Sequence, residues 1–146
     1  MNKKFLNTLY DLGLKEFENN ISPIAVSCEG ELKINPKLKA GSMKDCVYFI
    51  FRNYILDKIG KVGGGGRCMR MRALDYRSTD PTGVKIKQAI GNGEKIHIIA
   101  IYFEEKIDSV FGINTEGASH GPKLEKALIP IARAKGYNLI WNKNNG

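Results

Sequence analysis

Four consecutive glycines, Gly63 to Gly66, divide the chain where the spacing of its apolar residues changes. Before them, apolar residues recur every three or four positions, which is the spacing of an amphipathic helix that begins at Ser42 and ends at Gly60. After them, apolar and polar residues alternate, which is typical of half-buried strands. The change of period predicts a fold that contains both helices and an antiparallel sheet.

Turn residues set the limits of four strands within residues 67–114. The expected strands are residues 67–76, 84–90, 95–103 and 107–113, separated by Asp80-Pro81-Thr82-Gly83, Gly91-Asn92-Gly93 and Glu104-Glu105-Lys106. A helix that starts at Asp80-Pro81 is the competing interpretation of the second strand. The third strand is apolar on both faces, so we expect it at the centre of a four-stranded meander.

The sequence predicts a short hairpin and two further helices outside this meander. They are a hairpin of residues 24–28 and 31–34, an opening helix of residues 4–18 and a closing helix of residues 122–136. Pro130 lies inside the closing helix and predicts a kink or two short pieces, and residues 137–141 are expected to form a terminal strand. The expected fold class is α+β: an antiparallel four-stranded meander with helices packed on one face, plus a short N-terminal hairpin, in one domain of residues 1–146.

Composition excludes several classes of protein. Apolar residues make up 42% and charged residues 26% of the 146, near the average for soluble domains. The longest apolar runs are six residues, far below the roughly 20 needed to cross a bilayer, so no membrane partner is expected. No apolar signal core follows Lys3 and Lys4, and three widely spaced cysteines fit no disulfide framework. We expect a cytoplasmic protein with reduced cysteines.

The charge distribution points to a polyanionic partner. Lysine and arginine number 23 against 15 aspartate and glutamate residues, and residues 61–90 hold seven basic and two acidic side chains. Clustered basic residues attract phosphate-rich ligands such as a nucleic acid or a phosphorylated nucleotide. A soluble basic surface is the alternative.

The candidate phosphate-binding residues belong to the first two expected strands. Side chains two positions apart share a face of a strand, so pairing of these strands brings basic side chains together, in a register that the sequence does not determine. They are Arg67, Arg70, Arg72, Arg77, Lys85 and Lys87. An anion that bridges them would relieve their repulsion, and a solvated sheet face is the alternative.

Two histidines are the candidate catalytic residues. His97 lies in the apolar central strand, where a histidine is more often a core or sheet-face residue. His120 follows Ser119 just before a helix start, where backbone N–H groups favour an anion, although capping by Ser119 explains part of this pattern. Either histidine could act as general acid or base in a metal-independent ribonuclease.

No metal or cofactor site is expected. Glu31-Leu32-Lys33 has the carboxylate and lysine of metal-dependent nucleases, but the second carboxylate is missing. The cysteines and histidines lack the close pairs of a zinc site. No Gly-Lys-Ser/Thr follows the glycine run, which favours a hinge over a phosphate loop; the alternative is a loop whose backbone lies against a phosphate beside Arg67.

The leading hypothesis is a small basic protein that binds a phosphate-rich ligand, either nucleic acid, RNA included, or a nucleotide, without catalysis. One alternative is a toxin-like, metal-independent ribonuclease that uses one of the two histidines. Another is an interaction protein whose partner is an acidic protein. The sequence is also compatible with a homo-oligomer.

Overall fold

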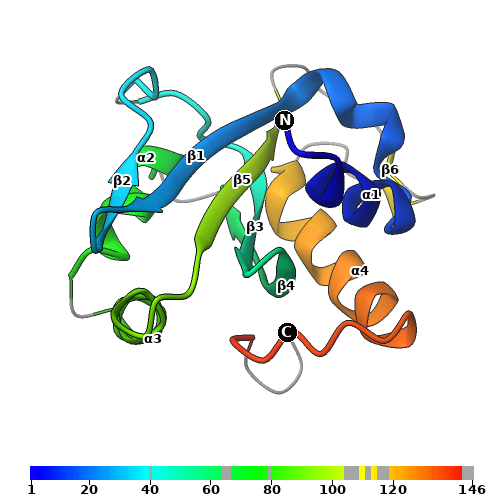
Figure 1. The fold of residues 1–146 in the computed structure, drawn as a ribbon. Helices are drawn as coiled ribbons and strands as arrows, with labels where there is room; N and C mark the ends of the chain where they lie inside the picture. The colour runs from blue at the N-terminus through cyan, green and yellow to red at the C-terminus, as the bar shows by residue number, and fades with distance from the viewer. Residues whose placement is uncertain are drawn as a thin grey trace.

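The computed structural model describes residues 1–39, 41–63, 67–78, 80–103, 109–110, 113–114 and 119–142. Its main feature is a five-stranded antiparallel sheet in the order β2-β1-β5-β3-β4, accompanied by helices, so the predicted α+β class is confirmed (Figure 1). The strands are β1 Ile21–Cys28, β2 Glu31–Ile34, β3 Cys46–Arg52, β4 Ile55–Val62 and β5 Ile96–Tyr102. The helices are α1 Lys3–Asp11, the 3-10 helix η1 Lys15–Asn20, α2 Met69–Asp75, α3 Pro81–Gly91 and α4 His120–Ala134. A further pair, β6 Ser109–Val110 and β7 Ile113–Asn114, forms a separate two-stranded ladder.

Elements with strong local turn chemistry lie where the sequence places them. Glu29 and Gly30 both have positive φ, at 51° and 80°, and close the predicted β1–β2 hairpin as a two-residue turn. β5 is the central strand, as expected, between β1 and β3. The opening helix is divided at Gly13, where φ is 85°, into α1 and η1.

The predicted helix between Ser42 and Gly60 is wrong, because the segment forms the β3–β4 hairpin. Asn53 and Tyr54, at φ 50° and 68°, make its turn. Six consecutive residues from Cys46 are buried, since β3 is covered on both faces. A strand covered on both faces loses its alternation, and its apolar residues then also fit a helical spacing.

The predicted strands 67–76 and 84–90 are also wrong, because they form α2 and α3. Asp80 caps α3 by accepting hydrogen bonds from the backbone N–H of Thr82 at 2.9 Å and of Gly83 at 3.3 Å, with Pro81 in the first turn. The competing interpretation of this segment is therefore correct. The side chains of α3 that reach the core, Ile86 and Ala89, are three positions apart, as in a helix.

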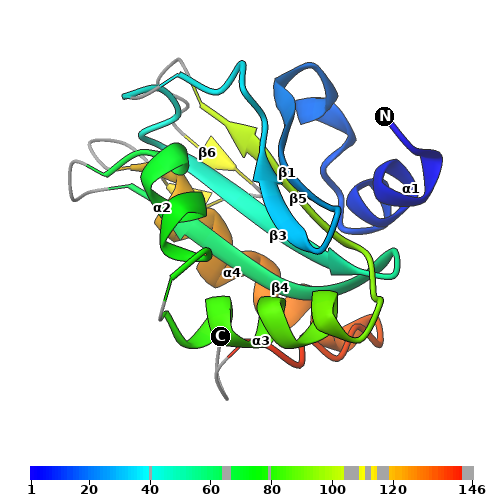
Figure 2. The same cartoon turned by 60° about the vertical axis from the view of Figure 1, so that its left-hand side comes forward.

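Helices cover both faces of the sheet, so the predicted packing on one face is wrong (Figure 2). The core under α1, η1 and α4 includes Phe5, Leu9, Phe49, Ile99 and Leu128, and the core under α2 and α3 includes Tyr48, Ile50, Met69, Ile86 and Ile98. Both cores exist because β3 and β5 present apolar side chains to each side.

The C-terminal part departs from the prediction in two ways. α4 continues through Pro130, whose ring is exposed, as one 15-residue helix rather than two pieces. Residues 137–141 form no strand; Leu139 has φ 47°, and the backbone N–H of Trp141 donates to the carbonyl of Asp57 at 2.9 Å. Most of the predicted strand 107–113 lies outside the described residues. None of the described helices has the length and apolarity needed to cross a bilayer.

Candidate active site

Two buried tyrosines from different elements share a hydrogen bond between their hydroxyl groups. Tyr48 lies on β3 and Tyr76 is the C-terminal cap of α2, and their rings meet edge to face with centroids 6.0 Å apart. Burial raises the pKa of Tyr48 to about 12 and raises that of Tyr76 further. Both phenols therefore stay protonated near neutral pH, and the pair keeps one hydroxyl hydrogen for a third group.

Glycines let the backbone approach both tyrosines. Gly60 lies opposite Tyr48 in the β3–β4 register, and a Cβ at Gly60 would overlap the Tyr48 ring. On the other side, a Cβ at Gly83 in α3 would lie 2.9 Å from the Tyr76 carbonyl oxygen. The tyrosine pair is therefore held between β4 and α3.

We predict that Gly60→Ala displaces the Tyr48 ring and destabilises the protein. Overpacking a close contact costs about 1–3 kcal/mol, and the free energy of unfolding measured by urea denaturation should fall by that amount. Gly91→Ala is the matched control, because its Cβ meets nothing within 4 Å and alanine favours a helix; it should be neutral or stabilise by up to about 1 kcal/mol. Equal stability of the two variants would contradict the close packing of Tyr48 on β4.

Two cationic side chains flank the tyrosine pair. The Lys58 Nζ on β4 donates to the Thr82 hydroxyl at 2.7 Å and lies 5.7 Å from the centroid of the Tyr76 ring. Burial lowers the pKa of Lys58. Arg72 on α2 interacts electrostatically with both tyrosines, and its Nε is buried without a hydrogen-bond partner among the described residues. Its nearest acidic atom within ion-pair range is an Asp75 carboxylate oxygen at 4.0 Å, so Arg72 keeps a strong donor for another group.

Glu125 brings a carboxylate from α4 to the same place. Its side chain is half-buried, and burial raises its pKa, while the charges of Lys61, Lys58 and Arg72 act in the opposite direction. Glu125 also interacts electrostatically with Tyr48. A carboxylate thus lies among three cations beside the tyrosine pair.

Asp45 fixes the start of α4, whose first residue, His120, lies five positions before Glu125. Its two carboxylate oxygens accept hydrogen bonds from the backbone N–H of His120 at 2.8 Å and of Gly121 at 2.6 Å. A Cβ on Gly121 would overlap the carbonyl of Cys46. The first turn of α4 is therefore packed directly against the start of β3, which positions the turn that carries Glu125.

These side chains form one group, which we call the central cluster. Its members are Tyr48, Lys58, Arg72, Tyr76 and Glu125. Groups of half-buried titratable side chains with shifted pKa values are typical of catalytic sites. The cluster combines donors for an anionic oxygen, a hydroxyl pair, a lysine with a lowered pKa and a carboxylate with a raised pKa.

Arg72 is the only predicted phosphate-binding residue in the central cluster. Arg67 is ion-paired with Asp75. The other four, Arg70, Arg77, Lys85 and Lys87, are exposed on or just after α2 and on α3, and none forms an ion pair with a described residue. The predicted pairing of these residues across two strands is wrong, because both segments are helices.

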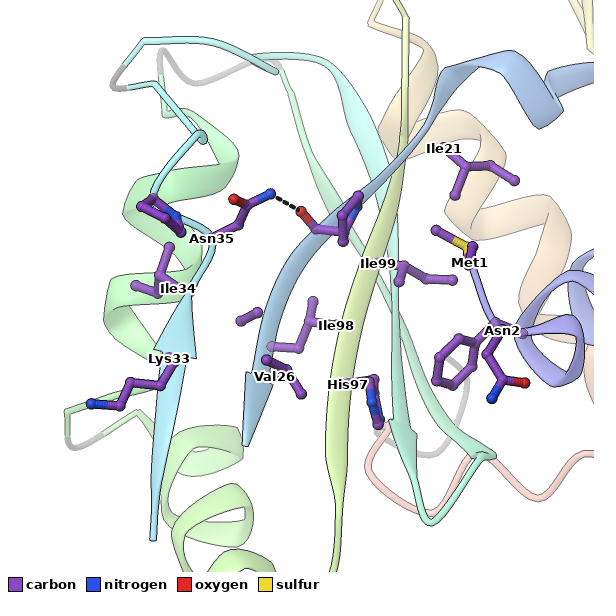
Figure 3. Close-up of a pocket in the computed structure, with 14 residues that line it drawn as sticks. Met1, Asn2, Ile21, Val26, Lys33, Ile34, Asn35, His97, Ile98 and Ile99 are labelled. Atoms are coloured by element: carbon purple, nitrogen blue, oxygen red, sulfur yellow. Dashed lines mark hydrogen bonds between the residues drawn. The ribbon is translucent and has the colours of Figure 1, made fainter. Parts of the chain in front are cut away.

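The structure places both candidate histidines in packed surroundings. His97 contacts the rings of Phe5 and Tyr54, with centroids 4.8 and 5.5 Å apart, beside a cavity of about 750 Å³ (Figure 3). Burial lowers the pKa of His97. His120 is buried against the edge of Phe103, and the helix start that was expected to favour an anion is already capped by a carboxylate of the chain, Asp45.

Sequence reasoning missed four members of the central cluster. Tyr48 and Lys58 lie inside the wrongly predicted helix, Tyr76 ends the wrongly predicted strand 67–76, and Glu125 lies in the predicted closing helix, where no pattern marks it. The Asn53-Tyr54 pair between two apolar segments was the available signal for the β3–β4 hairpin.

A scan against protein-family models found no match, and a search of curated proteins found none either. Among solved structures, the chain is similar to that of the bacteriophage T4 EndoII E118A mutant, with a TM-score of 0.49 and 22% sequence identity over 88% of this chain and 97% of that chain. A likeness at this TM-score carries no argument about function.

Proposed function

We propose that the chain binds nucleic acid and hydrolyses a phosphodiester bond at the central cluster. The observation that carries this proposal is the buried Nε of Arg72, which has no hydrogen-bond partner in the described part of the chain and lies near a hydroxyl pair and a carboxylate. An unsatisfied buried donor costs about 1–3 kcal/mol, and a bound anionic oxygen would remove that cost. A guanidinium matches the geometry of phosphate with two parallel donors.

The members of the cluster have distinct roles in this proposal. Arg72 binds a non-bridging phosphate oxygen and stabilises the negative charge that develops as water attacks phosphorus. Lys58, whose pKa is lowered, takes a proton from that water, and the tyrosine pair orients it by hydrogen bonding. A new bond forms from the water oxygen to phosphorus, the bond from phosphorus to one sugar oxygen breaks, and solvent protonates the leaving oxygen.

Glu125 is suited to a divalent cation. Mg²⁺ is commonly bound by one or two carboxylates together with substrate phosphates, and it keeps several of its waters. Within the described residues no set of three or more His, Cys, Asp or Glu could hold a metal alone, so a phosphate oxygen has to complete the site. A cation bound there would polarise the phosphate.

This proposal differs from binding without catalysis, the leading hypothesis from sequence. A pure binding site needs cations, but it does not need a tyrosine pair and a carboxylate beside them. The exposed Arg70, Arg77, Lys85 and Lys87 support contact with a polyanion in either case.

The direct test is incubation of the purified protein with labelled duplex DNA, single-stranded DNA and RNA, each with Mg²⁺ and with EDTA. We expect cleavage of at least one of these in Mg²⁺. All three remaining intact under both conditions would contradict the proposal. Cleavage in EDTA that disappears in His97→Ala or His120→Ala would instead favour the histidine-dependent ribonuclease.

We predict that the cleavage rate rises with pH in two steps. Glu125 binds a cation only when ionised, and Lys58 accepts a proton only when neutral, so each group acts in its deprotonated form. Because the pKa of Glu125 is raised from 4.5, the first step should lie above pH 4.5, and because the pKa of Lys58 is lowered from 10.5, the second should lie below pH 10.5. A profile of kcat/KM against pH measures both, and Lys58→Arg should remove the second step. A rate that falls as pH rises between 5 and 9 would contradict these roles.

A further inference from the structure

The exposed side of α2 combines apolar and basic side chains. Leu74 is four positions after Arg70, three after Met71 and three before Arg77, so the four side chains share one side of the helix and its end. Met71 and Leu74 are each 44% exposed, while Met69 and Ala73 on the opposite side are buried. Figure 2 shows α2 on the near side of the sheet. We call these four residues the outer face of α2.

The described residues neutralise the charges of the outer face only in part, because Glu31 on β2 interacts electrostatically with Arg77. Neither Arg70 nor Arg77 forms an ion pair with a described residue. Both arginines and Leu74 line a hollow of about 320 Å³ against β2, which also includes Glu31 and Lys33, an ion pair of β2. An exposed apolar pair between unpaired arginines fits a nucleic acid, whose phosphates bind the arginines and whose base edges contact the apolar side chains.

We propose that the outer face of α2 enters the groove of a DNA duplex and holds the adjacent backbone at the central cluster; this rests on the proposed function. Arg70 and Arg72 are two positions apart on α2, about 200° around the helix, so they lie on opposite flanks of the outer face, and the two strands that border a groove can each contact one of them. A helix is about 10–12 Å across, and the major groove of B-DNA is about 12 Å wide. The major groove of duplex RNA is too narrow for side-chain readout.

The proposal assigns different tasks to the two kinds of residue. Arg70 and Arg77 bind phosphates, so their contribution depends on salt. Met71 and Leu74 contact bases, so their contribution is independent of salt. Seven helical residues span about 10 Å, and this length corresponds to about three base pairs. Any sequence preference should therefore be confined to about three base pairs near the cleaved bond.

The test measures affinity for a labelled DNA duplex by fluorescence anisotropy at several salt concentrations, with EDTA present to prevent cleavage. The double variant Met71→Ser/Leu74→Ser should bind about tenfold more weakly with an unchanged salt slope. Arg70→Gln/Arg77→Gln should lower the slope of log affinity against log salt by about 2. Ile55→Ser is the matched control, because Ile55 is 60% exposed on β4, away from α2, and it should bind like the wild type.

Two results would overturn the proposal: duplex affinity unchanged in the Met71/Leu74 double variant, or an equal loss of affinity for duplex DNA and single-stranded RNA. Circular dichroism checks folding, and the single variants Met71→Gln and Leu74→Gln replace the double variant if it unfolds. Hydrolysis of bis(p-nitrophenyl) phosphate, which is too small to reach the outer face, should be the same in the double variant and the wild type. Duplex binding with the expected losses but no hydrolysis of any diester would refute the proposed function and leave the groove contact standing.

Discussion

Replacing Glu125 with glutamine should lower the rate of phosphodiester cleavage at least about a hundredfold, while the protein still folds and binds nucleic acid. Removing one preorganised electrostatic group from a catalytic site typically costs about 10²–10³ in rate. Binding should survive, because Arg72 keeps its positive charge and the exposed basic residues of α2 and α3 are unchanged. Stability should be unchanged or increase, because burial disfavours the charged form of Glu125 and glutamine is neutral.

Three measurements check this result: a single-turnover cleavage rate, anisotropy with a labelled duplex and thermal melting. Glu16→Gln is the control. Glu16 is an exposed carboxylate on η1, which covers the opposite face of the sheet from α2, and its replacement should leave all three measurements unchanged. Cleavage by Glu125→Gln at the wild-type rate would remove the carboxylate from the mechanism and return the chain to a binding role.

Arg72→Gln should reduce both the affinity for nucleic acid and the cleavage rate, the latter by about 10²–10³. Arg72→Lys should recover part of the affinity but little of the rate, because an ammonium group keeps the charge without the two parallel donors of a guanidinium. Stability should fall by no more than about 1 kcal/mol, since the ion-pair contact of Arg72 is an aspartate oxygen 4.0 Å away.

The control for Arg72 is Lys3→Gln, an exposed charge on α1, which covers the opposite face of the sheet from α2; it should leave the cleavage rate unchanged. Urea denaturation separates a catalytic from a structural effect. If Arg72→Gln unfolds at much lower urea and the remaining folded protein cleaves normally, Arg72 is a structural residue and the central cluster loses its anion-binding group.

Local chemistry made part of the fold predictable. The Glu29-Gly30 turn defines the β1–β2 hairpin, and the apolar run of β5 identifies the central strand. The opening and closing helices follow from their spacing. These features depend on neighbouring residues, which a sequence displays directly.

Other elements depended on tertiary packing. β3 is buried on both faces, so its alternation disappears and its residues also match a helix. In α3, Val84 looks like a core residue of a strand but is 43% exposed, whereas the Asp80 cap was a correct local sign of a helix. Periodicity alone could not decide between the two structures in either segment.

The central cluster was largely beyond sequence reasoning. It joins Tyr48 to Glu125, which are 77 positions apart, through strands and helices whose arrangement no local pattern defines. Arg72 was predicted because basic residues concentrate in its segment. The close contact between Gly60 and Tyr48 follows from the β3–β4 register, which requires the hairpin to be known first.

The most direct test of the central claim, that Arg72 holds a phosphate of the nucleic acid, is the NMR resonance of its Nε–H group. This resonance is assigned by its loss in Arg72→Lys and followed as a DNA duplex is added to the Glu125→Gln protein in EDTA. We predict a saturable downfield shift of the Arg72 Nε–H proton, because a donor with no partner among the described residues gains a charged acceptor. An Arg72 resonance that stays in place while those of Arg70 and Arg77 move would show that the phosphates bind only on the surface, and would contradict a catalytic role for the central cluster.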